Sequence, residues 1–361
     1  MSDADTTSFE PTHRVSLGRT SVQVDQLSIG TVPLSGLFEG VDHAESVAIL
    51  EAGWDNGNRT YDLAPLYGYG LAERVTGQVL GGRPRDELTI STKVGRLLRA
   101  NGPAERADAS IMYHGRSRFP DAGDIEPSFD FTYDGVMRSI EESRERSGFD
   151  RFDILHIHDP EGYLDEALDG AYRALDELRS AGVVGAIGVG SNFWQTHVEM
   201  AKRGDFDCFL LAGRYSLLDQ SSLAELLPLC ESRGIAVIAA GVFNSGILTH
   251  PDPASIADVS LDPGAMGSWK ESVTFDYEPA SAEIIDKAAR IKAVCDRHDV
   301  PLAAAAEQFP LHHPVVPCVL IGPRTAEHVS INNEWLRHPI PDDLWAELKH
   351  EGLLPEAAPT P

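Results

Sequence analysis

Asp62 and Tyr67 place two proton-transferring side chains in one short stretch of the chain. A run at 59–62 predicts a strand that ends at Asp62, and Tyr67 follows in a loop with glycine at positions 68 and 70. The apolar spacing at 71–80 then predicts a helix. In barrels of alternating strands and helices, catalytic groups cluster between a strand end and the next helix. The alternative is structural, with Asp62 capping the turn and Tyr67 packed on it.

Other polar groups stand at comparable positions further along. Lys93, His158 and the pair Ser191-Asn192 each follow an apolar run that predicts a strand. Each also has a structural explanation, because a lysine at the end of a strand is usually exposed to solvent and a histidine on a strand is usually a core residue. If the strands form a barrel, however, all these side chains point into one mouth. Their shared position therefore predicts a single site.

The elements that would position these residues alternate along the chain. After a predicted hairpin at 13–24, eight strand candidates lie near residues 27, 60, 90, 155, 187, 210, 237 and 319. Helical spacing is found at 42–56, 71–80, 134–146, 164–181, 197–203, 222–233, 281–298, 303–309, 327–336 and 342–348. Eight such units predict an α/β fold with a closed (β/α)8 TIM barrel, which typically has about 250 residues before insertions. The alternative is an open doubly wound sheet, but no Gly-x-Gly-x-x-Gly fingerprint follows the first strand.

Two long segments interrupt the alternation, at 97–132 and 250–277. Both exceed ordinary connections, and segments of this kind are usually lids, binding loops or disordered. We expect long loops over the C-terminal face of the barrel, where they would set substrate specificity. The predicted organisation is a disordered N-terminus (1–12), a single barrel domain (13–350) and a flexible C-terminal tail (351–361).

The composition is that of a globular, strongly acidic protein. Hydrophobic residues make up 42% of the chain, and 56 Asp and Glu against 30 Lys and Arg give a net charge of -26. This charge repels nucleic acid and anionic membranes, so we expect neither as a partner. Four widely spaced cysteines without a Cys-x-x-Cys pair predict reduced thiols and no zinc site, and no apolar run reaches the length of a membrane span. We therefore expect a cytoplasmic location.

Five motifs together resemble the aldo-keto reductase superfamily. They are YDLAPLYGYGLAE (61–73), ISTKVGR (90–96), RSIEESRERSGFDRFDILHIHDP (138–160), GVGSN (188–192) and IGPRTAEHVSINN (321–333). The likeness spans residues 13–337. Three further motifs, FDILHIHDP (152–160), AGRYSLLDQ (212–220) and GVFNSGIL (241–248), are similar to one branch. That branch contains L-fucose and D-threo-aldose 1-dehydrogenases and pyridoxal 4-dehydrogenases.

The resemblance implies a role for each of four catalytic residues. Tyr67 would be the general acid/base, Lys93 would lower its pKa, Asp62 would hold Lys93 by an ion pair, and His158 would hydrogen-bond the reacting oxygen. These roles are chemically consistent, because a phenol with an unperturbed pKa of about 10 needs a neighbouring cation to release its proton near neutrality. A neutral lysine would not supply that charge, so the aspartate keeps it protonated. No metal is required.

The resemblance also implies a nicotinamide cofactor, NAD or NADP. Its contacts would fall near the nicotinamide and its ribose, along the pyrophosphate and around the adenosine. Near the nicotinamide and its ribose, the matching residues are Gly30, Thr31, Asp62, Ser191, Asn192 and Tyr215. Along the pyrophosphate they are Ser245, Gly246 and Leu248. Around the adenosine they are Gly322, Arg324, Thr325, His328 and Asn332. In the last group, a helix N-terminus and basic side chains favour phosphate.

Three positions depart from the family pattern. Ala212 stands where many members have a glutamine, and Ala240 where many have a tyrosine that stacks on the nicotinamide. Tyr215 or Phe243 is the candidate substitute for that ring. His328 replaces a second arginine that often grips the 2′-phosphate of NADP. This replacement weakens the case for strict NADP use, so we expect dual use or a preference for NAD.

The expected function is the NAD(P)-dependent interconversion of a sugar or small alcohol with its carbonyl or lactone. Within that class the branch resemblance favours an aldose 1-dehydrogenase. One alternative is an NADPH-dependent aldehyde or ketone reductase. A second is a non-enzymatic, cofactor-binding regulatory subunit, because some proteins of this fold regulate potassium channels. The expected partner is a small-molecule sugar, alcohol or aldehyde, and the sequence does not determine the oligomeric state.

Overall fold

Eight parallel strands form the centre of the molecule. The computed structural model describes residues 9–37, 40–100, 108, 112–113, 116–120, 123, 125–253, 274–276 and 278–361. The strands are β3 (Leu27–Gly30), β4 (Thr60–Asp62), β5 (Thr89–Val94), β10 (Ile154–His158), β11 (Ala186–Ser191), β12 (Cys208–Ala212), β13 (Ala236–Ala240) and β16 (Cys318–Ile321). They close in that order, with β16 paired to β3. The predicted TIM barrel and its eight strands are confirmed, and the open sheet is excluded.

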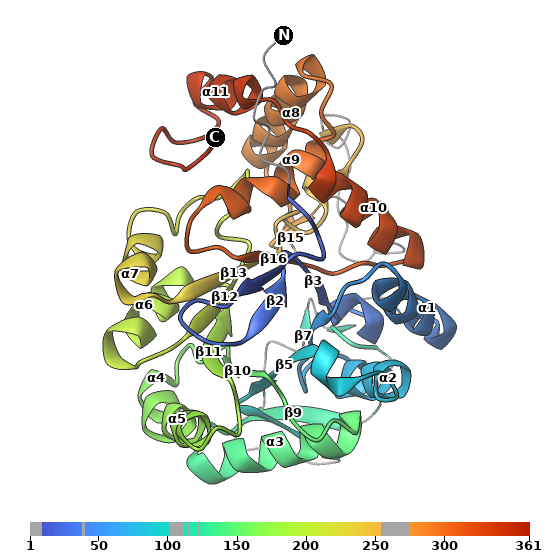
Figure 1. The fold of residues 1–361 in the computed structure, drawn as a ribbon, viewed down its shortest axis with the longest axis vertical. Coiled ribbons are helices and arrows are strands. Elements are labelled where there is room, and N and C mark those ends of the chain that lie inside the picture. The colour runs from blue at the N-terminus through green and yellow to red at the C-terminus, as the bar shows by residue number, and fades with distance from the viewer. Residues whose placement is uncertain are drawn as a thin grey trace.

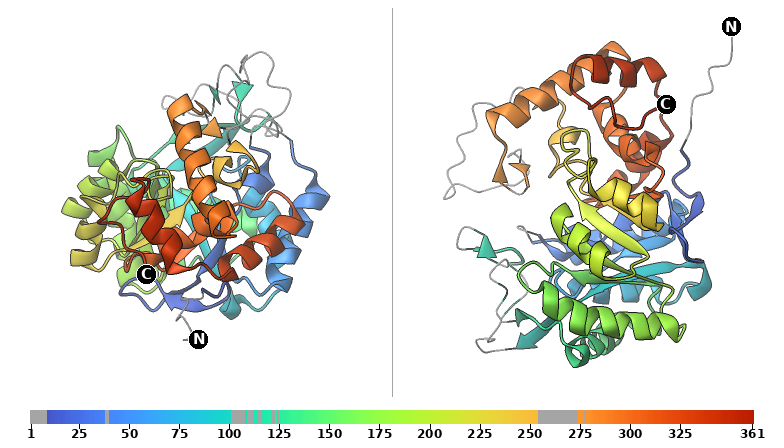
Figure 2. Two further views of the ribbon diagram at one scale, coloured as in Figure 1. Left: turned by 90° about the horizontal axis from the view of Figure 1, so that it is seen from above. Right: turned by 90° about the vertical axis from the view of Figure 1, so that its left-hand side faces the viewer.

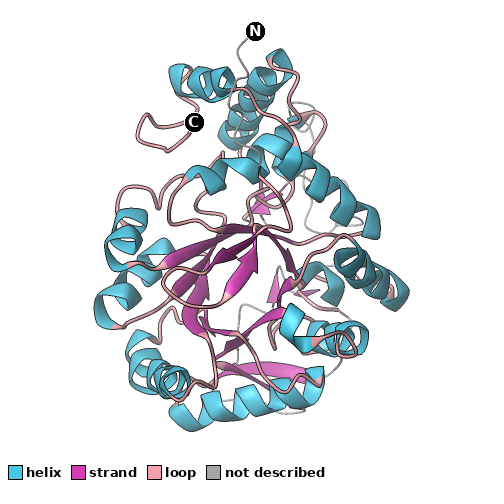
Figure 3. Ribbon diagram, viewed as in Figure 1, coloured by secondary structure: helices cyan, strands magenta, loops and turns pink. Residues whose placement is uncertain are grey.

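Helices surround this barrel (Figures 1 and 3). They are α1 (His43–Asp55), α2 (Leu71–Leu80), α3 (Tyr133–Ser147), α4 (Leu164–Glu166), a π-helical turn (Ala167–Tyr172), α5 (Arg173–Ser180), α6 (Trp194–Arg203), α7 (Leu226–Arg233), α8 (Ala282–Arg297), α9 (Leu302–Gln308), α10 (Ala326–Arg337) and α11 (Asp342–His350). Every predicted helix is present, although α6 begins earlier and α7 later than the spacing indicated. Figure 2 shows α8, α9 and α11 gathered at one end of the molecule.

Local signals explain where these elements begin and end. Thr132 starts α3, since its side chain accepts a hydrogen bond from the backbone N–H of Gly135 at 3.1 Å. The same helix ends at Gly148, whose φ of 72° is a left-handed conformation that glycine adopts without strain. The barrel strands are buried on both faces, as is typical of parallel sheets covered by helices.

An antiparallel hairpin closes the N-terminal end of the barrel. It consists of β1 (Arg14–Ser16) and β2 (Gln23–Asp25), as predicted. Leu17 and Val24 of this hairpin are fully buried in a cluster with side chains from the barrel strands, including Ile154 and Leu210. The mouth that the catalytic candidates share is therefore at the opposite, C-terminal end.

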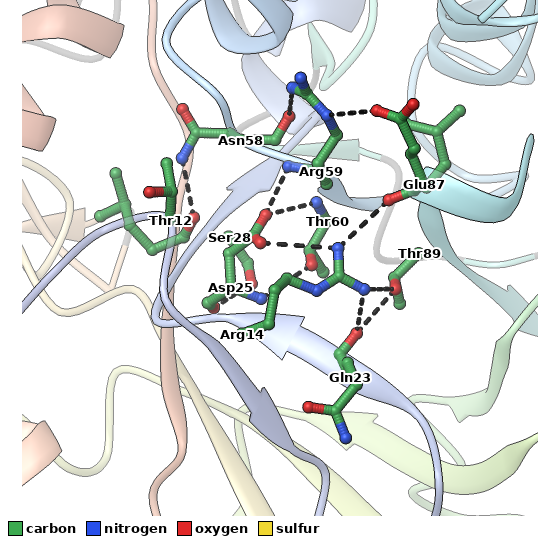
Figure 4. A network of polar contacts seen from close by, with 12 residues as sticks. Thr12, Arg14, Gln23, Asp25, Ser28, Asn58, Arg59, Thr60, Glu87 and Thr89 are labelled. Carbon is green, nitrogen blue, oxygen red and sulfur yellow. Dashed lines mark hydrogen bonds and ion pairs between the residues drawn. The ribbon is translucent and has the colours of Figure 1, made fainter. Parts of the chain in front are cut away.

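A buried polar network joins the hairpin to the barrel (Figure 4). The Asp25 carboxylate, which is 0% exposed, accepts hydrogen bonds from the backbone N–H groups of Arg59 at 2.5 Å and Thr60 at 2.7 Å. Arg14 lies 3.6 Å from Asp25 and donates to Thr89 Oγ1 at 2.7 Å. A buried carboxylate needs such partners to offset its lost hydration. The network thus ties β2 to the first residues of β4 and β5.

The long segment at 97–132 contains more regular structure than predicted. Strand β6 (Arg96–Ala100) pairs antiparallel with β9 (Ile125–Phe129), and β7 (Met112–Tyr113) pairs with β8 (Arg116–Ser117). Pro127 lies inside β9. A proline argues against a strand in the middle of a sheet, but it is tolerated in an edge strand. Both strands of a two-stranded sheet are edge strands. Of the rest of this segment, residues 108, 118–120, 123 and 130–132 are described and the others are not. Most of the segment 250–277 also lies outside the described residues, but β14 (Thr274–Phe275) near its end pairs with β15 (Glu278–Pro279) just beyond it.

Where the structure describes them, both chain ends contact the body of the protein. In the C-terminal tail, Leu353 and Leu354 are each 2% exposed and Ala358 is 1% exposed, and all three belong to the main core. The burial of these apolar side chains favours a packed tail. Near the N-terminus, Phe9 is buried and its ring contacts that of His312. Residues 1–8 lie outside the described part of the chain.

The four cysteines are all buried and unpaired. Cys208 and Cys318 lie on barrel strands, whereas Cys230 and Cys295 lie on the surrounding helices α7 and α8. Within the described residues, no helix is both long and apolar enough to cross a membrane. In the same residues, no cluster of His, Cys, Asp and Glu side chains could hold a metal ion.

Candidate active site

The structure brings the four predicted catalytic residues together at the C-terminal mouth. Asp62 ends β4, Lys93 lies near the end of β5, His158 ends β10, and Tyr67 lies in the loop between β4 and α2. Asp62 and Lys93 form an ion pair. The Lys93 Nζ atom lies 4.7 Å from the centre of the Tyr67 ring, and the Tyr67 and His158 ring centres are 6.0 Å apart at 90°. Tyr67 remains partly exposed, as a group that meets a substrate must be.

Lys93 is the deepest of the four, with an exposure of 1%. Its ammonium group also donates to the backbone oxygen of Leu63 at 2.9 Å, and Asp62 accepts a further hydrogen bond from Ser91 Oγ at 2.8 Å. Burial lowers the pKa of Lys93, while the Asp62 carboxylate acts in the opposite direction. The Asp62 carboxylate therefore opposes the loss of charge that burial favours at Lys93, beside the Tyr67 ring.

His158 is held as a neutral imidazole. Burial lowers its pKa well below the ordinary value, and the cations of Arg96 and Lys93 lower it further. Its Nδ1 atom has no hydrogen-bond partner within the described part of the chain. A neutral ring can hydrogen-bond a substrate oxygen without competing with Tyr67 as a charged acid.

The ends of β3 and β16 meet beside the catalytic group. Thr31 donates to the backbone oxygen of Asp62 through its N–H at 3.1 Å and its hydroxyl at 2.8 Å. Gly30 pairs with Asp62 in the sheet. A Cβ atom at Gly322 would lie only 2.9 Å from the Pro33 side chain. The predicted ribose residues and the start of the predicted adenosine segment are thus neighbours.

The predicted pyrophosphate loop has an unusual backbone. Asn244, Ser245 and Gly246 are consecutive left-handed residues, with φ of 46°, 60° and 100°. Two of the three carry a Cβ atom, for which this conformation is uncommon and strained. Strain of this kind persists at ligand clamps where surrounding contacts hold it, and here Asn244 Nδ2 donates to the Gly213 oxygen at 3.3 Å. Leu248, two residues further on, is 0% exposed, so the structure does not present it to a ligand.

The adenosine segment contains an acid that the sequence did not indicate. Thr325 caps α10 by accepting from the His328 N–H at 3.2 Å, and the His328 Nδ1 atom accepts from the Arg324 N–H at 3.4 Å. At the same helix end, Glu45 of α1 accepts from the Ala326 N–H at 3.1 Å. A carboxylate therefore lies at the positive end of this helix. Further along α10, the predicted Asn332 is 5% exposed.

Ser191 and Asn192, two predicted contacts near the nicotinamide, lie at the end of β11 and directly after it. The Ser191 hydroxyl donates to Glu161 Oε1 at 2.5 Å and accepts from the Phe193 N–H at 2.9 Å. The Asn192 backbone oxygen accepts from Arg214 Nε at 3.1 Å. Both residues are thus fixed by neighbours at the mouth.

Tyr215 does not join the site, and its expected role as a stacking ring is wrong. It is 1% exposed, and its ring packs 5.2 Å from that of Phe309 and 5.6 Å from that of His313. A ring enclosed by core side chains has no face for a cofactor. Phe243, the other candidate, is partly buried with its ring 6.1 Å from that of Trp335.

The sequence analysis missed a buried arginine beside His158. Arg96 is 2% exposed and contacts Asp108, His158 and Asp159. Arginine is rarely buried this fully unless it is paired. Its place in the motif ISTKVGR, three residues after Lys93, was the one available signal.

Comparison with known proteins decides the family. The model of the aldo/keto reductase family matches residues 26–351. The chain belongs to the aldo/keto reductase family. It is therefore an oxidoreductase, and the resemblance seen in its motifs is confirmed. Aldo-keto reductases use NAD(H) or NADP(H) and act on small carbonyl compounds or alcohols.

Two relatives are similar to this aldo-keto reductase over most of their length. Pyridoxal 4-dehydrogenase of Microbacterium luteolum is 43% identical, with 94% of this chain and 97% of the relative covered. D-threo-aldose 1-dehydrogenase of a Pseudomonas species is 40% identical, with 92% and 95% covered. Among solved structures, the glycerol dehydrogenase of Gluconobacter oxydans has a TM-score of 0.68 at 19% identity, covering 100% of this chain and 98% of its own. This last likeness shows the fold alone.

Proposed function

We propose that this aldo-keto reductase is an aldose 1-dehydrogenase, which oxidises the C1 hydroxyl of a sugar to a lactone. The observation that carries the proposal is the cluster of Tyr67, the Lys93–Asp62 ion pair and the neutral His158 at the open mouth. Two relatives of 40% identity or more bear dehydrogenase names, one of them for an aldose at C1. The cluster serves either direction, and the dehydrogenase names favour oxidation of an alcohol over reduction of a simple aldehyde.

The four residues have separate tasks in this reaction, and that of Asp62 is to hold Lys93 by the ion pair. His158 binds the substrate hydroxyl and orients it toward Tyr67. The Tyr67 phenolate, stabilised by the Lys93 ammonium, accepts the hydroxyl proton as general base. When bound, NAD(P) would supply the acceptor for the hydride that leaves the carbon bearing this hydroxyl group. In the reverse direction the Tyr67 hydroxyl donates the proton to the carbonyl oxygen.

The cofactor would lie across the mouth, with its preference set at the adenosine end. Ser191 and Asn192 would hold the nicotinamide end, and the left-handed loop 244–246 suits a clamp on the pyrophosphate. At α10, Arg324 would attract a 2′-phosphate, whereas the Glu45 carboxylate would repel it and could accept a hydrogen bond from a ribose hydroxyl. We therefore propose dual use or a preference for NAD. Four buried thiols also suit a cytoplasmic enzyme.

A substrate panel tests this proposal. Aldoses, pyridoxal and simple aldehydes are each assayed with NAD(H) and NADP(H) at 340 nm, with Tyr67→Phe as the matched inactive control. We expect the highest kcat/KM for an aldose in the direction of oxidation. Faster turnover of pyridoxal than of any aldose would instead indicate a pyridoxal dehydrogenase. Turnover restricted to the reduction of simple aldehydes would contradict the proposal and favour a reductase.

A further inference from the structure

Arg96 makes polar contacts in three directions from a buried position. Its Nε atom donates to Asp108 Oδ2 at 2.6 Å, one terminal nitrogen donates to the His158 backbone oxygen at 3.2 Å, and the other donates to Asp159 Oδ2 at 3.0 Å. The guanidinium also lies 4.6 Å from the centre of the Phe129 ring. At 2% exposure this side chain cannot touch a substrate, so its effect must pass through its partners.

These partners come from two separate parts of the fold. His158 and Asp159 form the carboxyl end of β10, where the catalytic histidine lies. Asp108 belongs to the segment between β6 and β9, and its N–H donates to the Pro127 oxygen of β9 at 3.1 Å. One guanidinium thus bridges the β6–β9 hairpin and the catalytic strand. This hairpin lies in the segment where we expected substrate specificity to be set.

The backbone that Arg96 grips is strained. Asp159 has a φ of 45° and precedes Pro160, a position that restricts the backbone further. A left-handed aspartate is strained and persists only when its surroundings hold it. Arg96 contacts this region at two points, the backbone oxygen of His158 and the Asp159 carboxylate. A third contact comes from the Asp159 N–H, which donates to the Gly190 oxygen at 3.0 Å.

We propose that Arg96 is a positioning residue that fixes the strained end of β10, so that His158 meets the reacting oxygen in the correct orientation. This inference rests on the proposed role of His158. It adds that the orientation depends on the β6–β9 hairpin, because Asp108 anchors the other side of the same guanidinium. Orientation errors of about 1 Å can cost about 100-fold in rate.

The charges around His158 give this proposal a distinctive signature. The groups that face the imidazole are Arg96, Lys93, His156 and Asp159, with the Tyr67 ring on the open side. The Asp159 carboxylate lies 3.6 Å from His158 Nε2 and is neutralised by Arg96. Without Arg96 a cation that lowers the pKa of His158 is lost, so that pKa should rise. His158 would then become protonated at a higher pH.

The test compares Arg96→Met and Arg96→Lys with Arg138→Met, an exposed arginine on the outer helix α3. The assay uses the best substrate of the panel above, and cofactor dissociation constants and thermal unfolding are measured in parallel. For Arg96→Met we expect a kcat reduced about 10- to 100-fold, an acidic limb of the pH–rate profile moved to higher pH, and cofactor binding within about twofold of wild type. For Arg96→Lys we expect the acidic limb to return toward wild type while kcat stays low, because charge is restored without the fork geometry. Arg138→Met should behave as wild type.

Other results would overturn the inference. An Arg96→Met enzyme with wild-type kcat and pH profile would show that the arginine does not position His158. So would a loss of activity that matches the loss of folded protein. If Arg96→Met does not fold, Asp108→Asn replaces it, and it must lower kcat at unchanged cofactor affinity. Tyr67→Phe separates the two levels: if it stays active the proposed site is wrong, whereas if it is inactive and the Arg96 variants are normal, only the positioning role fails.

Discussion

The ammonium group of Lys93 lies 4.7 Å from the centre of the Tyr67 ring and is ion-paired with Asp62. This relationship couples three residues from two strands and a loop. The carboxylate retains the charge on the lysine, and the lysine stabilises negative charge on the phenol. Changes at the tyrosine and at the lysine should therefore have different kinetic effects.

Replacement of Tyr67 by phenylalanine removes only the proton relay. We expect Tyr67→Phe to bind cofactor with nearly the wild-type dissociation constant and to lose about 10²–10⁴-fold in kcat, the usual contribution of a general acid/base. Steady-state kinetics and a fluorescence titration measure the two quantities. Tyr69→Phe, a buried tyrosine in the same loop, is the matched control. Turnover of Tyr67→Phe within a factor of a few of wild type would show that Tyr67 is not the acid/base.

Replacement of Lys93 removes the cation beside the phenol. We expect Lys93→Met to abolish most activity and to move the onset of oxidation to higher pH, because nothing then stabilises the phenolate. The pH–rate profile is the measurement. Since the single variant also leaves Asp62 buried without its partner, which typically costs about 3–5 kcal/mol of stability, the double variant Lys93→Met/Asp62→Asn serves as the folding control. An active enzyme with an unchanged profile would exclude the role of the ion pair.

The adenosine end should determine cofactor choice through opposing charges. Arg324→Ala should weaken NADP more than NAD by about 1–3 kcal/mol, since a charge-assisted contact to phosphate is lost. His328→Arg and Glu45→Gln should both tighten NADP, the first by adding a cation and the second by removing a carboxylate near the α10 N-terminus. Dissociation constants for both cofactors, measured by calorimetry at fixed salt, test these expectations.

The wild-type enzyme provides the decisive comparison for this set. A neutral His328 leaves Arg324 as the cation in this segment, because partial burial lowers the histidine pKa from a value already below neutrality. If wild type nevertheless prefers NADP by a hundredfold or more, the proposed balance is wrong. A second cation would then reach the phosphate from elsewhere in the chain.

Glu307 on α9 predicts an unusual dependence of stability on pH. It is 0% exposed, neither carboxyl oxygen has a hydrogen-bond partner within the described residues, and burial raises its pKa well above the ordinary 4.5. Above pH 4.5 the unfolded chain releases this proton while the folded chain keeps it. Stability should therefore fall by up to about 1.4 kcal/mol per pH unit until the raised pKa is passed. Urea denaturation between pH 5 and pH 8 measures the slope.

Glu307→Leu should remove that slope. It also removes an unsatisfied buried polar group, which costs about 1–3 kcal/mol, so the variant should be more stable than wild type, by a margin that grows with pH. Glu283→Leu, at an exposed position on α8, is the matched control and should leave the slope intact. Parallel stability curves for wild type and Glu307→Leu would contradict the assignment.

Local pattern was sufficient for the barrel itself. The helix α2 has the bounds that its apolar spacing indicated, and α3 ends at the glycine that follows its pattern. These features depend on neighbours in the sequence, where period and stop signals are readable. The four catalytic candidates could also be placed, because any residue just after a barrel strand faces the same mouth.

Contacts between distant residues could not be predicted in this way. Glu45 and Ala326 are separated by 281 positions, and Arg96 is 62 positions from His158. Whether a polar side chain is buried against such a partner depends on how the elements pack. The same limit explains Tyr215, where a ring next to a strand end pointed to the cofactor but packing placed it against Phe309.

The four buried thiols allow local unfolding to be measured by cysteine alkylation. Burial raises the pKa of Cys230, Cys295 and Cys318 to about 12 and that of Cys208 well above its usual range. Because only the thiolate attacks alkylating reagents, the native molecule should resist iodoacetamide at neutral pH. Each cysteine would then be alkylated at the rate at which its surroundings open. Peptide mass spectrometry could thus time the opening of the barrel interior separately from that of the outer helices, without an introduced label.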